Sequence, residues 1–78
     1  MEISLDKLLL NKTGKVIKVE DSLIKRRLLD IGLTNGTIVE KVMKNYSSNL
    51  CAYSIRNALI GIRNEDAKSV MIEVNYNE

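Results

Sequence analysis

The chain contains no histidine and one cysteine, Cys51, so the residue types that most often build metal centres and catalytic dyads are nearly absent. A metal-binding cluster of His and Cys side chains therefore cannot be assembled within one chain. A thiol nucleophile needs a neighbouring base, and no histidine is there to serve. We expect no enzymatic activity and no cofactor, and we interpret Cys51 as a small apolar residue that packs within a strand.

Long apolar runs are also missing. No stretch approaches the roughly 18 consecutive apolar residues that a membrane-spanning helix needs. Residues 1–4 lack the basic and apolar regions of a signal peptide. A single cysteine cannot form an internal disulfide, which suits a reducing compartment. These absences predict a cytoplasmic protein with no membrane span of its own.

Aromatic residues are scarce, with three tyrosines and neither phenylalanine nor tryptophan, so the core must be built from Leu, Ile and Val. The net charge is +2, and the single basic run, Lys25-Arg26-Arg27, has no aromatic residue interleaved with it. Nucleic-acid-binding surfaces usually combine clustered cations with aromatic platforms or a recognition motif. We therefore interpret this run as the solvated face of a helix and expect no nucleic-acid partner.

Carboxylates are the remaining candidates for metal ligands. The ones that stand together are the adjacent pairs Glu20-Asp21 and Glu65-Asp66, to which Glu73 can be added. Adjacent side chains diverge on a strand or a helix, so capping of helices and solvated surface charge explain these pairs better. We predict no metal site within one chain, while a site shared between two chains stays open.

The length of 78 residues predicts one domain, residues 1–78, with a small core. An amphipathic helix is predicted over Ser22–Ile31. Ile24, Leu28 and Ile31 fall at positions i, i+4 and i+7 and form one apolar stripe.

Both ends of this helix carry recognisable signals. Asp21 or Ser22 can cap the N-terminus by accepting a hydrogen bond from a free backbone N–H group. Gly32 stands where a residue in the left-handed conformation would end the helix, and Leu33 can fold back onto the last turn. Asn35-Gly36 then predicts a tight turn before a β-branched run.

The rest of the chain reads as short strands with turns between them. The predicted strands are Gly14–Glu20, Thr37–Met43, Leu50–Arg56, Ala58–Arg63 and Val70–Val74. Asn57, a residue type that tolerates positive φ, predicts a hairpin turn. Asn64 is the expected N-cap of a short helix whose first turn contains Glu65 and Asp66. The imperfect alternation in Lys15–Val19 indicates a bulge or burial on both faces.

A series of short motifs follows a characteristic order along the chain. The motifs are Leu8–Leu10 with Gly14-Lys15-Val16, Arg27–Leu33, Gly36-Thr37, Tyr53–Arg56 and Ala58–Arg63, followed by Glu65, Ala67 and Val70. In this order and spacing the sequence resembles the ferrous iron transport protein A (FeoA) family. The family often has proline at the position of Asn35 and glycine at that of Asn57.

The resemblance implies a fold and a function. The fold would be mainly β with short helices, an SH3-like small β-barrel of about five strands. The protein would be a cytoplasmic accessory factor of bacterial ferrous iron uptake. It would bind and regulate or assemble a FeoB-type GTPase-permease, which could recruit it to the inner face of the membrane, and self-association stays open. The alternative is a freestanding relative of the SH3-like C-terminal domain of diphtheria-toxin-repressor-type metalloregulators. That alternative requires a winged-helix DNA-binding domain, for which these residues leave no room.

With no reactive site, the surface has to carry the function. Arginine and tyrosine are enriched among residues that dominate protein–protein interfaces, so Tyr53, Arg27 and Arg56 are the candidate partner-binding residues. Arg63 has the same two interpretations as Arg27 and Arg56. The alternative for the arginines is structural, because each could form an ion pair with Asp30, Glu65 or Asp66 and fix the shape of a loop.

Overall fold

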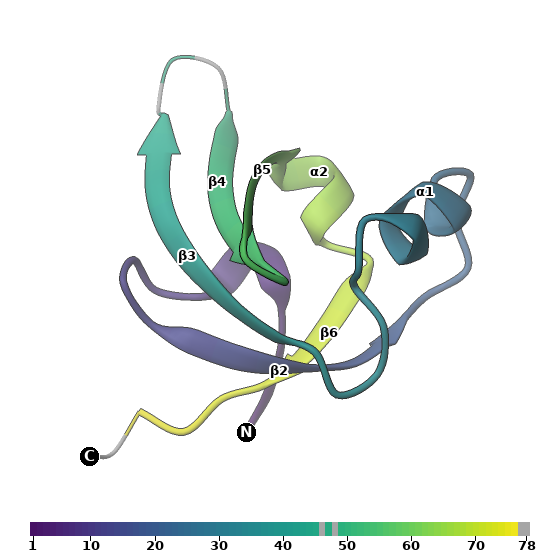
Figure 1. The fold of residues 1–78 in the computed structure, drawn as a ribbon, viewed down its shortest axis with the longest axis horizontal. Helices are drawn as coiled ribbons and strands as arrows, with labels where there is room; N and C mark the ends of the chain where they lie inside the picture. Colours follow the sequence, from purple (N-terminus) through teal and green to yellow (C-terminus); the bar gives the residue numbers. More distant parts are fainter. Residues whose placement is uncertain (46, 48, 77–78) are drawn as a thin grey trace.

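The computed structural model describes residues 1–45, 47 and 49–76, and these form a strongly bent antiparallel sheet with two short helices (Figure 1). The elements in chain order are β1 (Glu2–Ser4), the 3₁₀ turn η1 (Leu5–Lys7), β2 (Thr13–Val19), α1 (Lys25–Asp30), β3 (Ile38–Asn45), β4 (Leu50–Ile55), β5 (Ala58–Arg63), α2 (Asn64–Ala67) and β6 (Val70–Glu73). The order of strands in the sheet is β1-β6-β2-β3-β4-β5. The two outer strands of the described sheet are therefore β1 and β5.

The bent sheet has a concave face, and the core lies on this face. Figure 1 shows β3 and β4 curving away from β2 and β6, with α1 and α2 on the same side of the molecule. Strand β4 shows the pattern most clearly, because Cys51, Tyr53 and Ile55 are buried and alternate with partly exposed residues. The largest fully buried side chains are Tyr53, Leu5, Leu8, Leu33, Ile55, Ile72, Val16, Val39 and Val70. The core is thus aliphatic around one tyrosine.

Most predicted elements are present, with shifted ends. The bounds Ala58–Arg63 are confirmed, and the bulge expected in the first long strand lies in β2 between Val16 and Lys18. The helix predicted over Ser22–Ile31 is shorter, Lys25–Asp30. The prediction of an Asp21 or Ser22 side-chain cap is wrong, since the N-cap is Ile24 and no side chain caps it.

The end of α1 follows the sequence signal closely. Gly32 has φ 110°, its N–H donates to the Leu29 carbonyl, and the Leu33 N–H donates to the Leu28 carbonyl at 3.1 Å. These are the two bonds of a Schellman motif, which satisfies carbonyl groups that the helix leaves free. Leu33 is buried immediately afterwards, so the glycine turns the chain from the helix into the core.

The turn between β4 and β5 is a two-residue hairpin connection. Ile55 pairs with Ala58, and both residues between them have positive φ, 48° at Arg56 and 70° at Asn57. Positive φ at both positions is the signature of a type I′ turn, whose twist matches that of the flanking strands. The prediction for Asn57 is confirmed, whereas nothing in the sequence pointed to Arg56 in this conformation.

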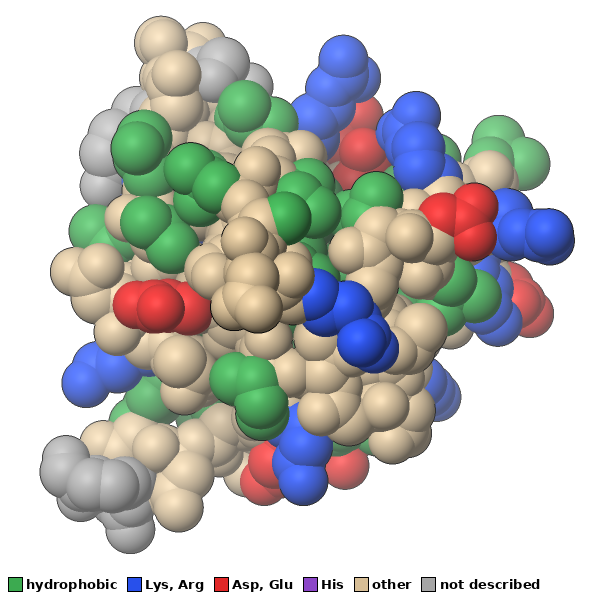
Figure 2. Space-filling view, in the orientation of Figure 1, with side chains coloured by type: hydrophobic (Ala, Val, Ile, Leu, Met, Phe, Trp, Pro, Cys, Tyr) green, Lys and Arg blue, Asp and Glu red, His purple; other side chains and the backbone are tan. Residues whose placement is uncertain are grey.

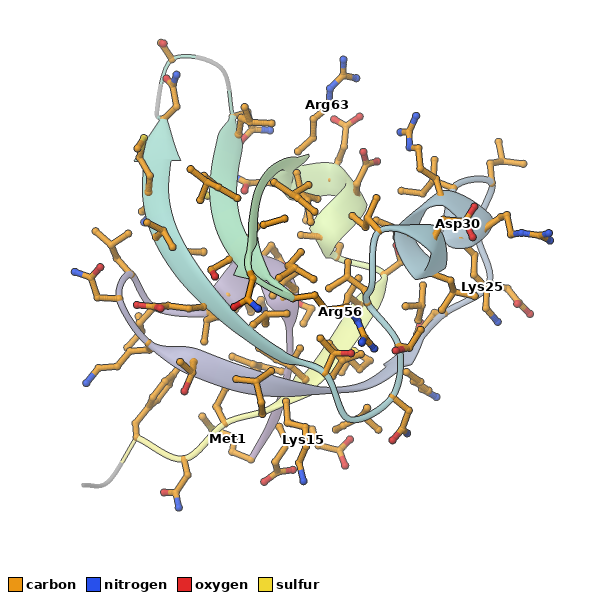
Figure 3. The ribbon with its side chains drawn as sticks, in the orientation of Figure 1. Met1, Lys15, Lys25, Asp30, Arg56 and Arg63 are labelled. Atoms are coloured by element: carbon orange, nitrogen blue, oxygen red, sulfur yellow. The ribbon has the colours of Figure 1, made fainter. Side chains whose placement is uncertain are left out.

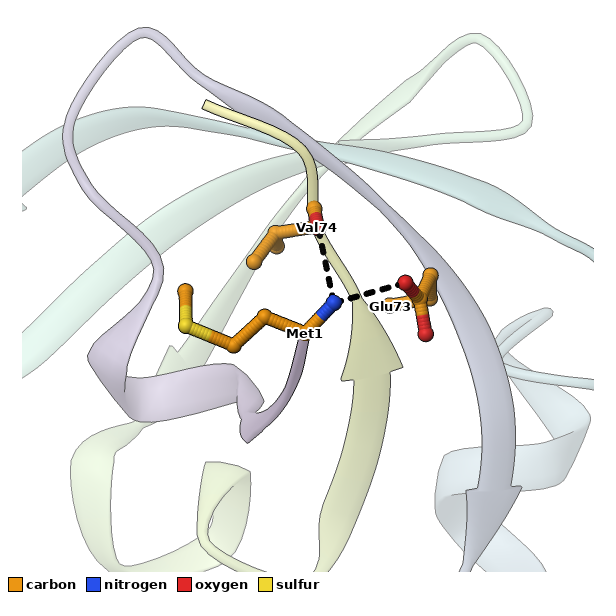
Figure 4. A network of polar contacts seen from close by, with 3 residues as sticks. All are labelled: Met1, Glu73 and Val74. Atoms are coloured by element: carbon orange, nitrogen blue, oxygen red, sulfur yellow. Dashed lines mark hydrogen bonds and ion pairs between the residues drawn. The ribbon is translucent and has the colours of Figure 1, made fainter. Parts of the chain in front are cut away.

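Strand β1 was not predicted, and it joins the two ends of the described chain. Glu2, Ile3 and Ser4 pair with Glu73, Ile72 and Met71 of β6. Figure 4 shows the Met1 amino group donating to Glu73 Oε2 at 2.7 Å and to the Val74 carbonyl at 3.2 Å. The Val74 N–H in turn donates to the Met1 carbonyl at 2.9 Å. Asn64 likewise differs from its expected role, because it is the first residue of α2 and Arg63 is the N-cap.

Candidate functional site: a groove beside the edge strand

A groove of about 420 Å³ lies between α1, β5 and the start of α2. It is lined by Arg27, Leu28, Ile31, Leu50, Ile60, Gly61, Ile62, Arg63 and Asp66. These residues come from α1 and its C-cap on one side and, much further along the chain, from the consecutive elements β4, β5 and α2 on the other. The sheet bend and the turn at Gly32 are what bring α1 opposite β5.

The floor of the groove is apolar. Strand alternation places Ile60 opposite Tyr53 and Ile62 opposite Cys51, so both isoleucines face the inside of the sheet. Leu28 and Ile62 are buried, and Ile31 and Ile60 are half-buried. Two members of the helix stripe predicted from the sequence, Leu28 and Ile31, therefore pack here, and the partly exposed Ile31 and Ile60 leave apolar surface at the bottom of the groove.

The rim of the groove carries charge of mixed sign. Arg27 on α1 and Arg63 at the end of β5 are exposed, and Asp66 is partly exposed. Figure 3 shows the Arg63 side chain pointing away from the body of the molecule. Among the described residues neither arginine lies within 4.0 Å of a carboxylate; Asp30 instead lies 3.8 Å from Arg26 Nε. The ion pairs expected for Arg27 and Arg63 are therefore absent from this part of the chain, and both guanidinium groups are available to a ligand.

Arg56 has a different role, because its side chain holds the loop after α1. Its Nη2 donates to Thr34 Oγ1 at 2.9 Å and to Thr37 Oγ1 at 3.0 Å, and its Nε donates to the Gly32 carbonyl at 3.4 Å. It lines a second, shallower hollow of about 360 Å³ together with residues 35–38. The expected ion pairs with acidic residues are not formed, yet the interpretation of Arg56 as a residue that fixes loop shape agrees with these contacts.

Tyr53 does not belong to any contact surface, and the prediction that it binds a partner is wrong. Its side chain is 0% exposed, and its hydroxyl donates to the Leu5 carbonyl at 3.4 Å. Burial raises the pKa of the hydroxyl well above its usual range, with a further contribution from Cys51. The Lys41 ammonium lies 5.7 Å from the ring centroid, and burial lowers the pKa of Lys41. The sequence contains a signal of this burial, because the period-2 pattern of β4 places Tyr53 on the same face as Cys51 and Ile55.

The structure thus separates the three candidate partner-binding residues. Arg27 lines the groove, Arg56 braces the neighbouring loop, and Tyr53 fills the core. Sequence reasoning missed Asp66 and the apolar floor as parts of one site. No local pattern could reveal them, because the groove exists only once α1, β5 and α2 are packed side by side.

Cys51 and the carboxylates make no reactive centre among residues 1–45, 47 and 49–76. The buried Cys51 Sγ lies 3.3 Å from Asn64 Oδ1, and no three His, Cys, Asp or Glu side chains of these residues are grouped to hold a metal ion. No helix in the same residues is long and apolar enough to cross a membrane.

We expect the isolated chain to bind no ferrous iron stoichiometrically. The physical reason is the lack of His and the dispersal of carboxylates over the described surface. Anaerobic calorimetric titration with ferrous iron is the measurement. One iron per chain bound with micromolar or tighter affinity would contradict the expectation and would direct attention to a site between chains.

Comparison with known proteins gives a family match over most of the chain. A family model described as FeoA domain matches residues 3–74. No curated protein matches the chain. The matched segment begins within β1 and continues just past β6, so it contains β2 to β6, most of β1 and both helices.

Solved structures share this fold at low sequence identity. A FeoA-like protein from Clostridium acetobutylicum is 24% identical, with a TM-score of 0.90 over 99% of this chain and 91% of that one. A zinc complex of FeoA from Stenotrophomonas maltophilia, described as a prokaryotic SH3 domain protein, is 24% identical, with a TM-score of 0.81 over 91% and 89%. A manganese-dependent transcriptional repressor is 14% identical, with a TM-score of 0.83 over 95% of this chain and 42% of that protein. The SH3-like fold expected from the sequence is confirmed.

Proposed function

The chain belongs to the FeoA domain family, and from this premise we propose that it is a non-catalytic accessory protein of ferrous iron uptake. It acts in the cytoplasm by docking onto the cytoplasmic part of a FeoB-type GTPase-permease, which it regulates or helps to assemble. The observation that carries the proposal is the groove between α1 and β5, whose apolar floor is flanked by two arginines without acidic partners in the described chain.

Such a surface suits protein recognition better than chemistry. Interface hot spots combine a desolvated apolar centre with arginine or aromatic anchors at its margin. The groove supplies the partly exposed Ile31 and Ile60 as the centre and Arg27 as an anchor. Arg56 supports the proposal indirectly, because it fixes the loop that follows α1.

Replacing Arg27 with alanine is expected to weaken binding to the cytoplasmic region of the permease about tenfold, because a charge-assisted contact is lost. The measurement is a titration of the purified GTPase domain and the remaining cytoplasmic loops. Arg26→Ala is the matched control, since Arg26 lies next to Arg27 on α1 but faces solvent beside Asp30 and does not line the groove. Urea melts should show both variants folded.

Two results would contradict the proposal at different levels. If wild type binds none of the cytoplasmic pieces, direct docking is wrong. If wild type binds and both Arg27→Ala and Arg63→Ala bind as well as Arg26→Ala, docking stands but uses another surface.

The second candidate function is that of a freestanding relative of a metalloregulator's SH3-like domain. Its support is the fold shared with the manganese-dependent transcriptional repressor, of which this chain matches 42%. This candidate has less support than the first. A cluster of metal-ligating residues would favour it, and the described residues contain none. Capture of a DNA-binding protein in place of the permease would favour it.

A further inference from the structure

Strand β5 has an open edge that faces the groove. It pairs with β4 and with no other strand of the described sheet. The two-residue turn makes Ile55 and Ala58 a hydrogen-bonded pair. Because hydrogen-bonded and non-hydrogen-bonded pairs alternate along an antiparallel ladder, this first pair determines which later residues of β5 bond to β4. Ile60 and Ile62 exchange backbone bonds with β4, whereas the N–H and C=O groups of Leu59 and Gly61 point away from it.

This edge lacks the devices that usually protect an outer strand. Natural edges are blunted by lysine, proline, bulges or extreme shortness. The other outer strand, β1, has three residues, but β5 has six, its ladder to β4 is unbroken, and its sequence Ala-Leu-Ile-Gly-Ile-Arg carries charge only at the last position. An exposed edge of this kind is a template on which another extended chain can pair.

The groove runs along this template with a helix on its far side. Gly61 lines the groove and presents backbone without a side chain, while Arg27 and Leu28 of α1 and its C-cap Ile31 line the opposite side. A strand laid beside β5 would therefore have Ile60, Ile62 and Leu28 beneath it. On the outer face its neighbour would be Leu59, which is 64% exposed. The exposed Met43 of β3 lies two strands further on, in the row of Gly61. Figure 2 shows hydrophobic side chains gathered over β3–β5 on this face.

Charge limits what the added strand can be. Arg27 and Arg63 stand at the rim without carboxylate partners in the described chain, and the single acidic lining residue is Asp66. An acidic side chain on the incoming segment would meet a guanidinium group in a partly desolvated site, where such contacts are strong.

We propose that the groove takes an extended acidic segment of a partner protein, which adds to the sheet as a strand beside β5. The bound segment alternates small apolar side chains over Ile60 and Ile62 with acidic side chains that reach Arg27 or Arg63. The identity of the partner as the permease rests on the proposed function, whereas the mode of binding rests on the geometry of β5.

The test uses the full, isotope-labelled chain and two kinds of probe. One is a set of short end-blocked peptides that tile the cytoplasmic segments of the permease; the other is an end-blocked peptide of alternating Glu and Val residues. We expect acidic peptides to shift the amide signals of Leu59 and Gly61. Gly61→Pro should weaken their binding about tenfold, because it removes an edge donor that β4 does not use.

Gly61→Ala is the matched control for the proline variant. Both substitutions add a Cβ, which meets Leu50 Cδ2 at 3.3 Å, but alanine keeps the N–H group, so Gly61→Ala should bind about tenfold more tightly than Gly61→Pro. If Gly61→Pro fails to fold, N-methylation of the bound peptide replaces it. Methyl groups at alternate amides, those facing β5, should weaken binding about tenfold, and methyl groups at the intervening amides should not.

The outcomes separate the binding mode from the function. Equal binding by folded Gly61→Pro and Gly61→Ala, or signal changes confined to another face, would overturn the proposal. So would binding of the intact permease region with no binding of any peptide, which leaves docking itself in place. If the Glu–Val peptide binds at β5 while neither the tiles nor the permease region binds, the strand-addition site stands and the proposed function falls.

Discussion

Replacing Tyr53 with alanine is expected to cost about 3–5 kcal/mol of folding free energy, the range for removing a buried aromatic side chain. The tyrosine is 0% exposed at the centre of an otherwise aliphatic core, and its truncation leaves a cavity between β4 and η1. Domains of this size are only marginally stable, so the variant should be largely unfolded. Urea unfolding followed by circular dichroism measures the loss.

Tyr53→Phe is the control that keeps the ring. At neutral pH it should cost about 1 kcal/mol or less, because the Leu5 carbonyl still accepts from the Leu8 N–H. The unfolded hydroxyl ionises above about pH 10 and the buried one does not, so wild type should lose about 1.4 kcal/mol per pH unit relative to Tyr53→Phe in that range. Wild-type stability in the alanine variant, or no alkaline difference between wild type and Tyr53→Phe, would contradict the burial of this side chain.

Replacing Gly32 with valine is expected to cost about 2–4 kcal/mol, the sum of backbone strain and crowding. Gly32 has φ 110°, which β-branched residues strongly disfavour. A Cβ there would also lie 2.9 Å from Arg56 Cδ and 3.2 Å from Ile55 Cγ2. The substitution therefore disturbs the end of α1 and the brace on the following loop together. Thermal and urea unfolding measure the cost.

Gly36 provides a matched control within the same loop. Its φ is 94°, but a Cβ there meets no atom within 4 Å, so Gly36→Val should show backbone strain alone and cost about 1–2 kcal/mol less than Gly32→Val. Gly32→Asn should also cost less than Gly32→Val, because asparagine tolerates positive φ. Equal losses for Val and Asn at residue 32 would show that the backbone conformation does not limit the choice of residue there.

The features that the sequence predicted well are those with local causes. The apolar stripe of α1, its glycine stop and the alternation of β6 each depend on residues within one or two turns or one strand. The prediction for Asn57 succeeded because hairpin turns demand positive φ. The prediction of the helix cap failed because α1 begins at Lys25 with Ile24 as its N-cap, so the expected capping residues lie ahead of the cap position. Asp21 instead contacts the side chain of Lys25 at 3.2 Å.

The features that the sequence did not predict depend on distant parts of the chain. Strand β1 is too short to show a period, and its partner β6 lies at the other end of the described residues. The residue type of Tyr53 suggests a place on a contact surface, whereas its position in the alternation of β4 indicates burial. The groove needs α1 and β5 side by side, and the openness of β5 depends on which strands fail to pair with it.

The pairing of β1 with β6 also determines when the sheet can be completed. The three residues of β1 pair with residues about seventy positions further along the chain. Closing so long a loop costs conformational entropy before any contact between the two strands compensates for it. The hairpin of β4 and β5 needs only two intervening residues. We therefore expect the hairpin to form early and the β1–β6 pair to form late. During synthesis the core around Leu5 would stay open until the last strand has left the ribosome, so the late stage is the one exposed to proteases and chaperones.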